Sequence, residues 1–147
     1  MPSSPQIALS TGDEMKISKQ VQEALETNRP VVALESTIIS HGLPYPRNIA
    51  AAKESEQQLI DAGVVPATIG IIKGVPTIGL SQDELEQIAG EGTAKSSVRD
   101  LPIIAAKGIN GATTVAATAF LAAKAGIRVF ATGGLGGVHQ GANETFD

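Results

Sequence analysis

The chain contains no cysteine and no tryptophan, and it has one tyrosine and three phenylalanines. Without cysteine it forms no disulfide, no zinc–cysteine site and no catalytic thiolate. Because aromatic rings are so few, the stacking platforms that bind single-stranded nucleic acid are nearly absent. The core must instead be built from alanine, valine, isoleucine and leucine, which the 42% hydrophobic content supplies.

Basic residues are not in excess, since the formal net charge is −4. Proteins that bind nucleic-acid polymers usually carry a basic stripe that neutralises phosphates, so no such partner is expected. A small anionic ligand stays compatible with this charge, because it needs only a local cluster of N–H groups and cations. No apolar run approaches the roughly 20 residues that span a bilayer, so we expect a soluble, cytoplasmic protein without membrane contact.

The length fits one ordinary domain, and no repeat or linker divides the sequence. Residues 1–16 mix small, polar and acidic residues without an apolar segment, and they are expected to form a flexible leader. Residues 17–147 are then expected to form part of a single α/β domain.

Apolar runs and helical periodicity alternate along residues 17–147. Strands are predicted at Val31–Leu34, Ala67–Ile72, Thr77–Leu80, Leu101–Ala106 and Ile127–Ala131. Helices are predicted from Ile17 to before Asn28, over Asn48–Ala62, from a capping box at Ser81 to near Gly90, and from near Gly111 to Ala125, with a loop over Gly92–Asp100. This alternation predicts the α/β class, with a largely parallel sheet, helices on both faces and ligands at the carboxyl ends of the strands.

A glycine-rich segment, Thr132–Gly141, directly follows the last predicted strand. Glycine allows positive φ and close approach to a ligand, and successive free N–H groups form anion-binding nests. A flexible surface loop is the alternative explanation. We favour ligand binding, because flexibility alone rarely requires so many glycines at a strand's carboxyl end.

Two further strand ends carry polar side chains. Glu35 follows Val31–Leu34, and if its carboxyl is buried there it could act as a general acid, although a cap or ion-pair role is equally consistent. The segment Asn110–Thr114 lies at a strand-to-helix junction, where the free N–H groups of the helix start attract anions and Thr113 and Thr114 could add hydroxyl donors. Its alternative role is simple capping of that helix by Asn110 or Thr113.

A polar loop, Lys95–Asp100, holds two cations and two hydroxyls that suit a phosphate monoester, although solvated loop charges would explain it equally well. Asp147 follows His139 and Glu144, and its carboxylate is a ligand type that Mg²⁺ and Mn²⁺ prefer, but a single carboxylate does not make a metal site. The sequence motifs of phosphate loops, dinucleotide sites and zinc proteases are missing.

Three segments resemble one known family. Val31–Gly42, Asn110–Val115 and Ala131–His139 with Thr145–Asp147 are similar to the pseudouridine-5'-phosphate glycosidases, also called the indigoidine synthase A family. The resemblance runs in order over Ile17–Asp147 and corresponds to the N-terminal half of the family's chains.

The resemblance implies reversible cleavage of pseudouridine 5'-phosphate to uracil and ribose 5-phosphate, with a divalent metal, usually manganese, in a homotrimer. It also implies roles for six residues: Glu35 as proton donor, Lys95 and Val115 as substrate contacts, Thr132 and His139 as further contributors to the pocket, and Asp147 as metal ligand. Gln140 departs from the family pattern, in which arginine is expected at this position.

The family breaks a carbon–carbon bond by forming a lysine Schiff base on the ring-opened ribose, which supplies an electron sink. That lysine is expected beyond residue 147, so the 147-residue chain is expected to be inactive by itself. One alternative is a truncated, non-catalytic homologue that at most binds a sugar phosphate. Another is a different sugar-phosphate lyase or isomerase on the same scaffold.

Overall fold

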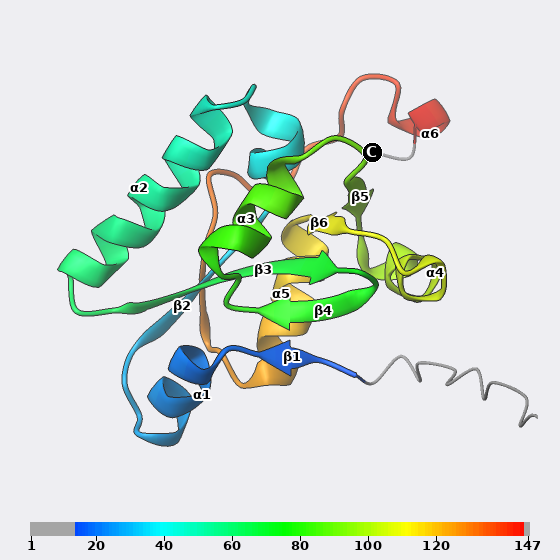
Figure 1. Ribbon diagram of the computed structural model, residues 1–147. Coiled ribbons are helices and arrows are strands. Elements are labelled where there is room, and N and C mark those ends of the chain that lie inside the picture. Colours follow the sequence, from blue (N-terminus) through cyan, green and yellow to red (C-terminus); the bar gives the residue numbers. More distant parts are fainter. Residues whose placement is uncertain (1–13, 146–147) are drawn as a thin grey trace, which may run out of the picture.

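The structure is a computed structural model that describes residues 14–145 (Figure 1). The strands are β1 (Lys16–Ile17), β2 (Val31–Leu34), β3 (Val65–Ile72), β4 (Val75–Ile78), β5 (Ala94–Ser96), β6 (Gly111–Thr113) and β7 (Val129–Ala131). The helices are α1 (Lys19–Glu26), α2 (Arg47–Asp61), α3 (Gln82–Ala89), α4 (Leu101–Lys107), α5 (Val115–Ala125) and α6 (Ala142–Thr145), with a π-helical turn at Ile38–Gly42 and a 3₁₀ turn at Val98–Asp100.

The strands form one mixed sheet in which β3 is central. The path runs β1–β4–β3–β2–β7, and β6, which also pairs with β5, joins β3. The pairs β1–β4, β2–β3, β2–β7 and β5–β6 are parallel, whereas β3–β4 and β3–β6 are antiparallel. The predicted α/β class with a largely parallel sheet is therefore confirmed.

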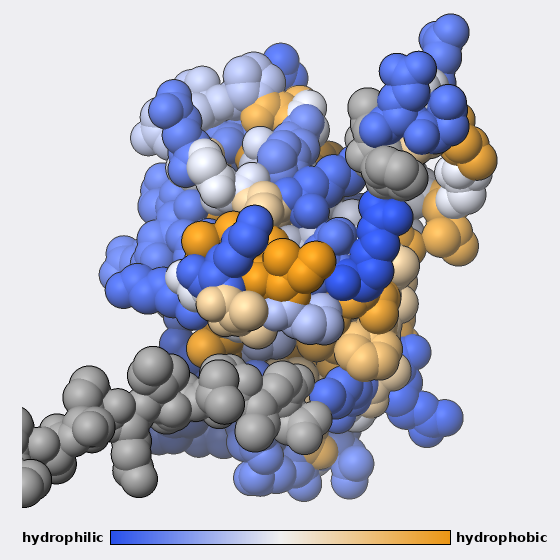
Figure 2. Space-filling view, turned by 90° about the vertical axis from the view of Figure 1, so that its right-hand side faces the viewer, coloured by the Kyte–Doolittle hydropathy of each residue, from blue (hydrophilic) through white to orange (hydrophobic). Residues whose placement is uncertain are grey.

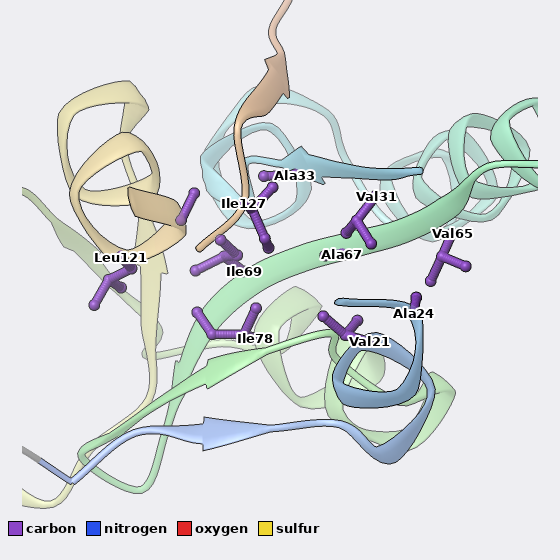
Figure 3. Packing of buried hydrophobic residues seen from close by; sticks show 11 residues of the cluster. Val21, Ala24, Val31, Ala33, Val65, Ala67, Ile69, Ile78, Leu121 and Ile127 are labelled. Atoms are coloured by element: carbon purple, nitrogen blue, oxygen red, sulfur yellow. The ribbon is translucent and has the colours of Figure 1, made fainter. Parts of the chain in front are cut away.

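Helices cover both faces of this sheet. On one face, α1 and α5 pack against β2, β3 and β4, and Figure 3 shows Val21, Ile69, Ile78 and Leu121 meeting in that layer. On the other face, α2, α3 and the π-helical turn enclose a second cluster around Ile88. Both clusters are aliphatic, as the scarcity of aromatic residues requires. The prediction of helices on both faces is confirmed.

The capping box at Ser81 begins α3 as predicted. The Glu84 backbone N–H donates to Ser81 Oγ at 3.2 Å, and Glu84 Oε2 accepts from the Ser81 N–H at 2.7 Å. Burial alone would raise the pKa of Glu84, but hydrogen bonds from Lys16 and Ser81 together lower it below its ordinary value. The Lys16 Nζ lies 2.6 Å from Glu84 Oε1, so this carboxylate also joins α3 to β1.

The strand predicted at Leu101–Ala106 is wrong, because this segment forms α4. Pro102 lies in the first helical turn, where a missing N–H costs nothing, whereas in a central strand it would remove a ladder hydrogen bond. Ile104 is buried while Ile103 is 53% exposed. A helix therefore accommodates this short apolar run with one side facing solvent.

The strand predicted at Thr77–Leu80 has different bounds in the structure. β4 begins earlier, at Val75, and forms an antiparallel hairpin with β3. Lys73 and Gly74 at the turn have φ of 48° and 83°, the left-handed pair that a type I′ turn requires. The Lys73 N–H donates to Asn110 Oδ1 at 2.8 Å, which fixes the turn against the segment before β6.

Two boundaries near the predicted loop are also corrected. Residues 92–100, predicted as loop, contain β5 and the 3₁₀ turn, and the helix predicted from Gly111 begins at Val115 because Gly111–Thr113 form β6. Pairing with β3 and β5 is a tertiary effect that local sequence does not reveal. Residues 1–13 of the predicted leader lie outside the described residues, and its last residue, Lys16, belongs to β1.

The side of the molecule that carries α4 exposes apolar as well as charged residues (Figure 2). Besides Ile103, the exposed apolar side chains of the described region include Val98, Ile109 and Phe120. Apolar side chains exposed on one side of a molecule are suited to a contact with other protein surface. Among the described helices, none has the length and apolar character needed to cross a membrane.

Candidate functional site

The carboxyl ends of four strands converge on one place. β2 and β6 lie along the same edge of β3, since β4 occupies the other edge. β2 runs parallel to β3 as far as the pair Leu34–Thr68, and β6 runs antiparallel to it with Ala112 opposite Gly70. Their carboxyl ends therefore point at each other. β7 is parallel to β2 and β5 is parallel to β6, so these two strands end there as well.

A cavity of about 810 Å³, termed the larger cavity, opens where these strands end. Its walls come from the segments that follow β2, β5, β6 and β7. It is lined by Glu35, Thr37, Lys95, Ser97, Arg99, Asp100, Thr114, Val115, Ala116, Ala119, Gly134, Leu135, Gly136 and His139. The structure thus brings together Glu35, Lys95, Val115 and His139, four of the six site residues predicted from the sequence.

Glu35 directly follows β2 and is half-buried rather than enclosed. Its Oε1 accepts a hydrogen bond of 2.6 Å from the hydroxyl of Thr132, the residue that directly follows β7. Glu35 also lines the smaller cavity, about 410 Å³, which lies beside α2 and includes Thr132 and Gly133. Thr132, predicted as a contributor to the pocket, therefore lies beside the acid and lines the smaller cavity rather than the larger one.

The cationic part of the larger cavity comes from β5 and the turn after it. Lys95 is the central residue of β5, and Arg99 lies in the 3₁₀ turn. Asp100 caps this turn, because its Oδ2 accepts from the Ser97 N–H at 2.8 Å, and its Oδ1 lies 3.7 Å from Arg99 Nε. Folding of the predicted polar loop thus places both cations on one wall.

The amino end of α5 forms the adjoining wall. Thr114 caps this helix, with its Oγ1 accepting from the Ala117 N–H at 3.3 Å. The alternative that Asn110 or Thr113 caps it is wrong, because Thr113 is a buried residue of β6 and Asn110 binds the β3–β4 turn. Val115 lies in the first turn of α5, where unpaired N–H groups carry partial positive charge.

The glycine-rich segment supplies the remaining wall. Gly134, Leu135 and Gly136 line the larger cavity beside His139, and Gly136 has φ of 93°, which favours glycine. The Gly134 N–H donates to Thr132 Oγ1 at 3.4 Å. The segment therefore lines a cavity, and ligand binding by it stays a prediction.

The predicted metal ligand, Asp147, lies outside the described residues. Within residues 14–145, no group of three or more histidine, aspartate and glutamate residues is arranged to hold a metal ion. His139 and Glu144 therefore belong to no three-ligand group in that part of the chain. The manganese site stays a prediction.

Sequence reasoning did not single out Ser36 and Thr37 as site-forming residues, and it treated Thr113 as a hydroxyl donor to a ligand or a helix cap rather than as a partner of these two. All three lie at the facing ends of β2 and β6, and the Thr37 hydroxyl donates to the Thr113 carbonyl at 2.8 Å. The available sequence pattern was a run of hydroxyl residues after each of two apolar segments. What it could not reveal is that these two strands meet end to end.

Comparison with known proteins gives consistent matches. A family model described as indigoidine synthase A-like protein matches residues 20–147. The chain is 65% identical over 132 residues to a pseudouridine-5'-phosphate glycosidase of Saccharopolyspora erythraea and 58% identical over 135 residues to one of Escherichia coli. These matches cover 89% and 90% of the chain but 44% and 43% of the relatives. The chain therefore spans less than half the length of the curated relatives it matches.

Two solved structures share the fold. An indigoidine synthase A-like protein of Thermotoga maritima superimposes with a TM-score of 0.78 at 39% identity, covering 89% of this chain and 43% of that one. The prealnumycin C-glycosynthase AlnA, solved in complex with ribulose 5-phosphate, gives a TM-score of 0.76 at 41% identity, covering 92% of this chain and 44% of that one.

Proposed function

The chain belongs to the indigoidine synthase A-like family, and from this premise we propose that the protein carrying it is a pseudouridine-5'-phosphate glycosidase. Such an enzyme reversibly converts pseudouridine 5'-phosphate and water to uracil and ribose 5-phosphate. The proposal is supported by the names of the relatives. The observation that carries it is the larger cavity, which is lined by a carboxyl, two cations and the amino end of a helix.

Lys95, Arg99 and the amino end of α5 suit the phosphate of the substrate. A lysine supplies a point charge and an arginine a bidentate donor pair, while free N–H groups at a helix start add partial positive charge. Phosphate binding so far from the reacting carbon would provide binding energy for the chemical step. The substrate contacts predicted at Lys95 and Val115 would then serve this end of the molecule.

Glu35 suits the base end of the substrate. Breaking a carbon–carbon glycosidic bond leaves no oxygen or nitrogen leaving group to protonate, so the uracil carbon that loses the sugar must itself receive a proton. We assign that proton transfer to Glu35, which Thr132 holds at the edge of the larger cavity. The sugar carbon takes up the hydroxyl of water, by way of a lysine Schiff base supplied from beyond residue 147.

The proposal extends to a manganese ion bound through Asp147, to a homotrimer and to the cytoplasm, all three resting on the family resemblance. When bound, a divalent cation would neutralise charge on the sugar phosphate. The apolar side chains exposed beside α4, among them Ile103 and Phe120, are suited to a contact with another subunit or with more of the same polypeptide.

The test uses the full-length protein that carries this sequence. Uracil, ribose 5-phosphate and Mn²⁺ are incubated with it at neutral pH, and pseudouridine 5'-phosphate is measured by chromatography and mass spectrometry. Formation of the carbon-linked nucleotide is expected. Failure to form it would sink the assignment, and binding of ribose 5-phosphate without synthesis would favour the non-catalytic homologue instead.

A further inference from the structure

A cluster of three hydroxyl groups is buried where β2 and β6 meet. Ser36, Thr113 and Thr118 are each fully buried. Ser36 directly follows Glu35, Thr113 is the last residue of β6, and Thr118 lies in the first turns of α5. The cluster therefore joins the segment that carries the acid to the elements that form the opposite wall of the larger cavity.

The direction of each hydrogen bond in this cluster follows from one carbonyl. Since the Ile69 carbonyl can only accept, the Thr113 hydroxyl donates to it, at 2.7 Å. Thr113 Oγ1 then has only lone pairs left, so Thr118 Oγ1 donates to it at 2.9 Å and Ser36 Oγ donates to it at 3.2 Å. All three protons are used, and Thr113 is the centre of the cluster.

The side chains of Ser36 and Thr37 bond the backbone groups of Thr113 that strand pairing leaves without a partner. β2 and β6 each pair with β3 rather than with each other, so among the described strands none accepts the Thr113 N–H on the side of β2. Ser36 Oγ accepts that N–H at 2.8 Å, and the Thr37 hydroxyl donates to the Thr113 carbonyl. Both backbone polar groups of Thr113 are thus bonded to the two residues that follow Glu35.

We propose that Ser36 and Thr113 are positioning residues that set the spacing across the active site. They fix Glu35 relative to the cationic wall, because Thr113 pairs with Ser96 beside Lys95 and α5 begins two residues after it. The inference rests on the proposed function in assigning proton transfer to Glu35. It goes further by naming what holds that carboxyl at its distance from the bound phosphate.

A purely stabilising role would have a different signature. If the cluster only adds stability, its loss lowers the free energy of unfolding but leaves the placement of Glu35 and the turnover of folded enzyme unchanged. If it positions Glu35, its loss lowers kcat while KM for ribose 5-phosphate changes little, because Lys95 and Arg99 of the cationic wall are unchanged. Small displacements of a reacting group cost up to about a hundredfold in rate.

The deciding variants are Thr113→Val, which removes the hydroxyl but keeps the shape, and Thr113→Ser, which keeps the hydroxyl. The matched control is Thr77→Val in β4, where an equally buried threonine donates one hydrogen bond, of 3.0 Å, to the Val75 carbonyl. In the full-length protein, we expect Thr113→Val to lower kcat about tenfold to a hundredfold. KM should stay within about threefold, and both Thr113→Ser and Thr77→Val should keep nearly full kcat. An unchanged kcat in Thr113→Val, or an equal loss in Thr77→Val, overturns the proposal.

A crystal structure of the Thr113→Val protein gives a readout that does not depend on activity. We expect Glu35 to shift relative to Val115, and an unshifted Glu35 overturns the proposal. If the wild-type protein makes no pseudouridine 5'-phosphate, the proposed function fails, and this displacement alone decides the positioning role. If Thr113→Val does not fold, Ser36→Ala is measured in the same two ways, because it leaves the bond from Thr113 to Ile69 in place.

Discussion

The two regions that flank Glu35 are built in opposite ways. On one side, the buried hydroxyl cluster of Ser36, Thr113 and Thr118 is sealed from solvent and fully hydrogen-bonded. On the other side, the glycine-rich segment 132–141 is exposed throughout, and its Leu135 and Val138 are 83% and 87% exposed. One region is therefore fixed by buried hydrogen bonds, whereas the other lies open to solvent.

This difference separates two tasks of a binding site. A reacting carboxyl needs a constant position, which buried and satisfied hydrogen bonds provide. A segment that closes over a ligand needs backbone freedom, which glycine provides at the cost of conformational entropy. We therefore expect the hydroxyl cluster to hold Glu35 in a constant position and the glycine-rich segment to be the more adjustable part of the site, and the following experiments test this difference.

The largest effect is expected for Glu35, which lies between the two regions. Replacing Glu35 by glutamine removes the proton-transfer role proposed for it while preserving size, so kcat of the full-length protein should fall by about 10²- to 10⁴-fold. Steady-state kinetics in the direction of synthesis measure this change. Glu54→Gln on the exposed side of α2 is the control, and a Glu35→Gln enzyme with full activity would refute the proton-donor role.

The cationic wall is joined to the fixed region by the pairing of β5 with β6, and it should affect binding more than turnover. Lys95→Met keeps the length of the side chain but removes its charge, so KM for ribose 5-phosphate should rise about tenfold to a hundredfold, the value of one charge-assisted hydrogen bond. The salt dependence of KM should weaken at the same time. The exposed Lys107 in α4 provides the control, Lys107→Met, and an unchanged KM in Lys95→Met contradicts the assignment.

Glycines in the two regions should differ in their tolerance of a methyl group. A Cβ added at Gly111 in β6 would lie 2.5 Å from the buried Ser96 Oγ, whereas one added at Gly134 would meet nothing within 4 Å. Gly111→Ala should therefore lower the free energy of unfolding by about 1–3 kcal/mol, and Gly134→Ala should change it by less than about 0.5 kcal/mol. Denaturant unfolding of the full-length protein measures both, and equal effects would remove the contrast.

Thr132 joins the glycine-rich segment to the acid, so its loss tests how much the exposed region contributes. Thr132→Val removes the hydrogen bond to Glu35 and should lower kcat by about threefold to tenfold, in line with one hydrogen bond of about 1 kcal/mol. Thr132→Ser keeps the hydroxyl and should retain activity. A loss in Thr132→Val as large as that in Glu35→Gln would show that the exposed side is the dominant restraint.

The smallest effect is a pH dependence of stability from Glu56 in α2, which belongs to neither region. Burial raises the pKa of Glu56 above its ordinary value, and the hydrogen bond that Thr68 donates to it at 2.8 Å offsets this only in part. A raised folded-state pKa means that the folded chain binds the proton more tightly, so stability should decline as pH rises from the ordinary value through the raised one.

Glu56→Gln should abolish this decline and make the protein slightly more stable at neutral pH. Unfolding free energies across the acidic range measure it, with Glu54→Gln controlling for the loss of one negative charge on α2. A decline that persists in Glu56→Gln would assign it to another group.

The local parts of the fold were accessible from the sequence, and the non-local parts were not. The apolar run of β2, the capping box of α3 and the Gly126 end of α5 depend on neighbouring residues, and each was found. The short strands β5 and β6 were missed because three residues acquire strand geometry only by pairing. In the site, Glu35, Lys95 and the Asn110–Thr114 segment could be chosen from the sequence and family resemblance, but the hydrogen bonds that join Ser36 to Thr113 could not.

The junction of β2 and β6 also has a consequence for the order of folding. Its hydrogen bonds join residues 77 positions apart in the sequence, and contacts of such separation form only after a large loop has closed. Helices such as α2 need no such closure, since their bonds are local. We therefore expect secondary structure to appear before the carboxyl of Glu35 reaches its working distance from the cationic wall, so that catalytic competence is among the last properties the folding chain acquires.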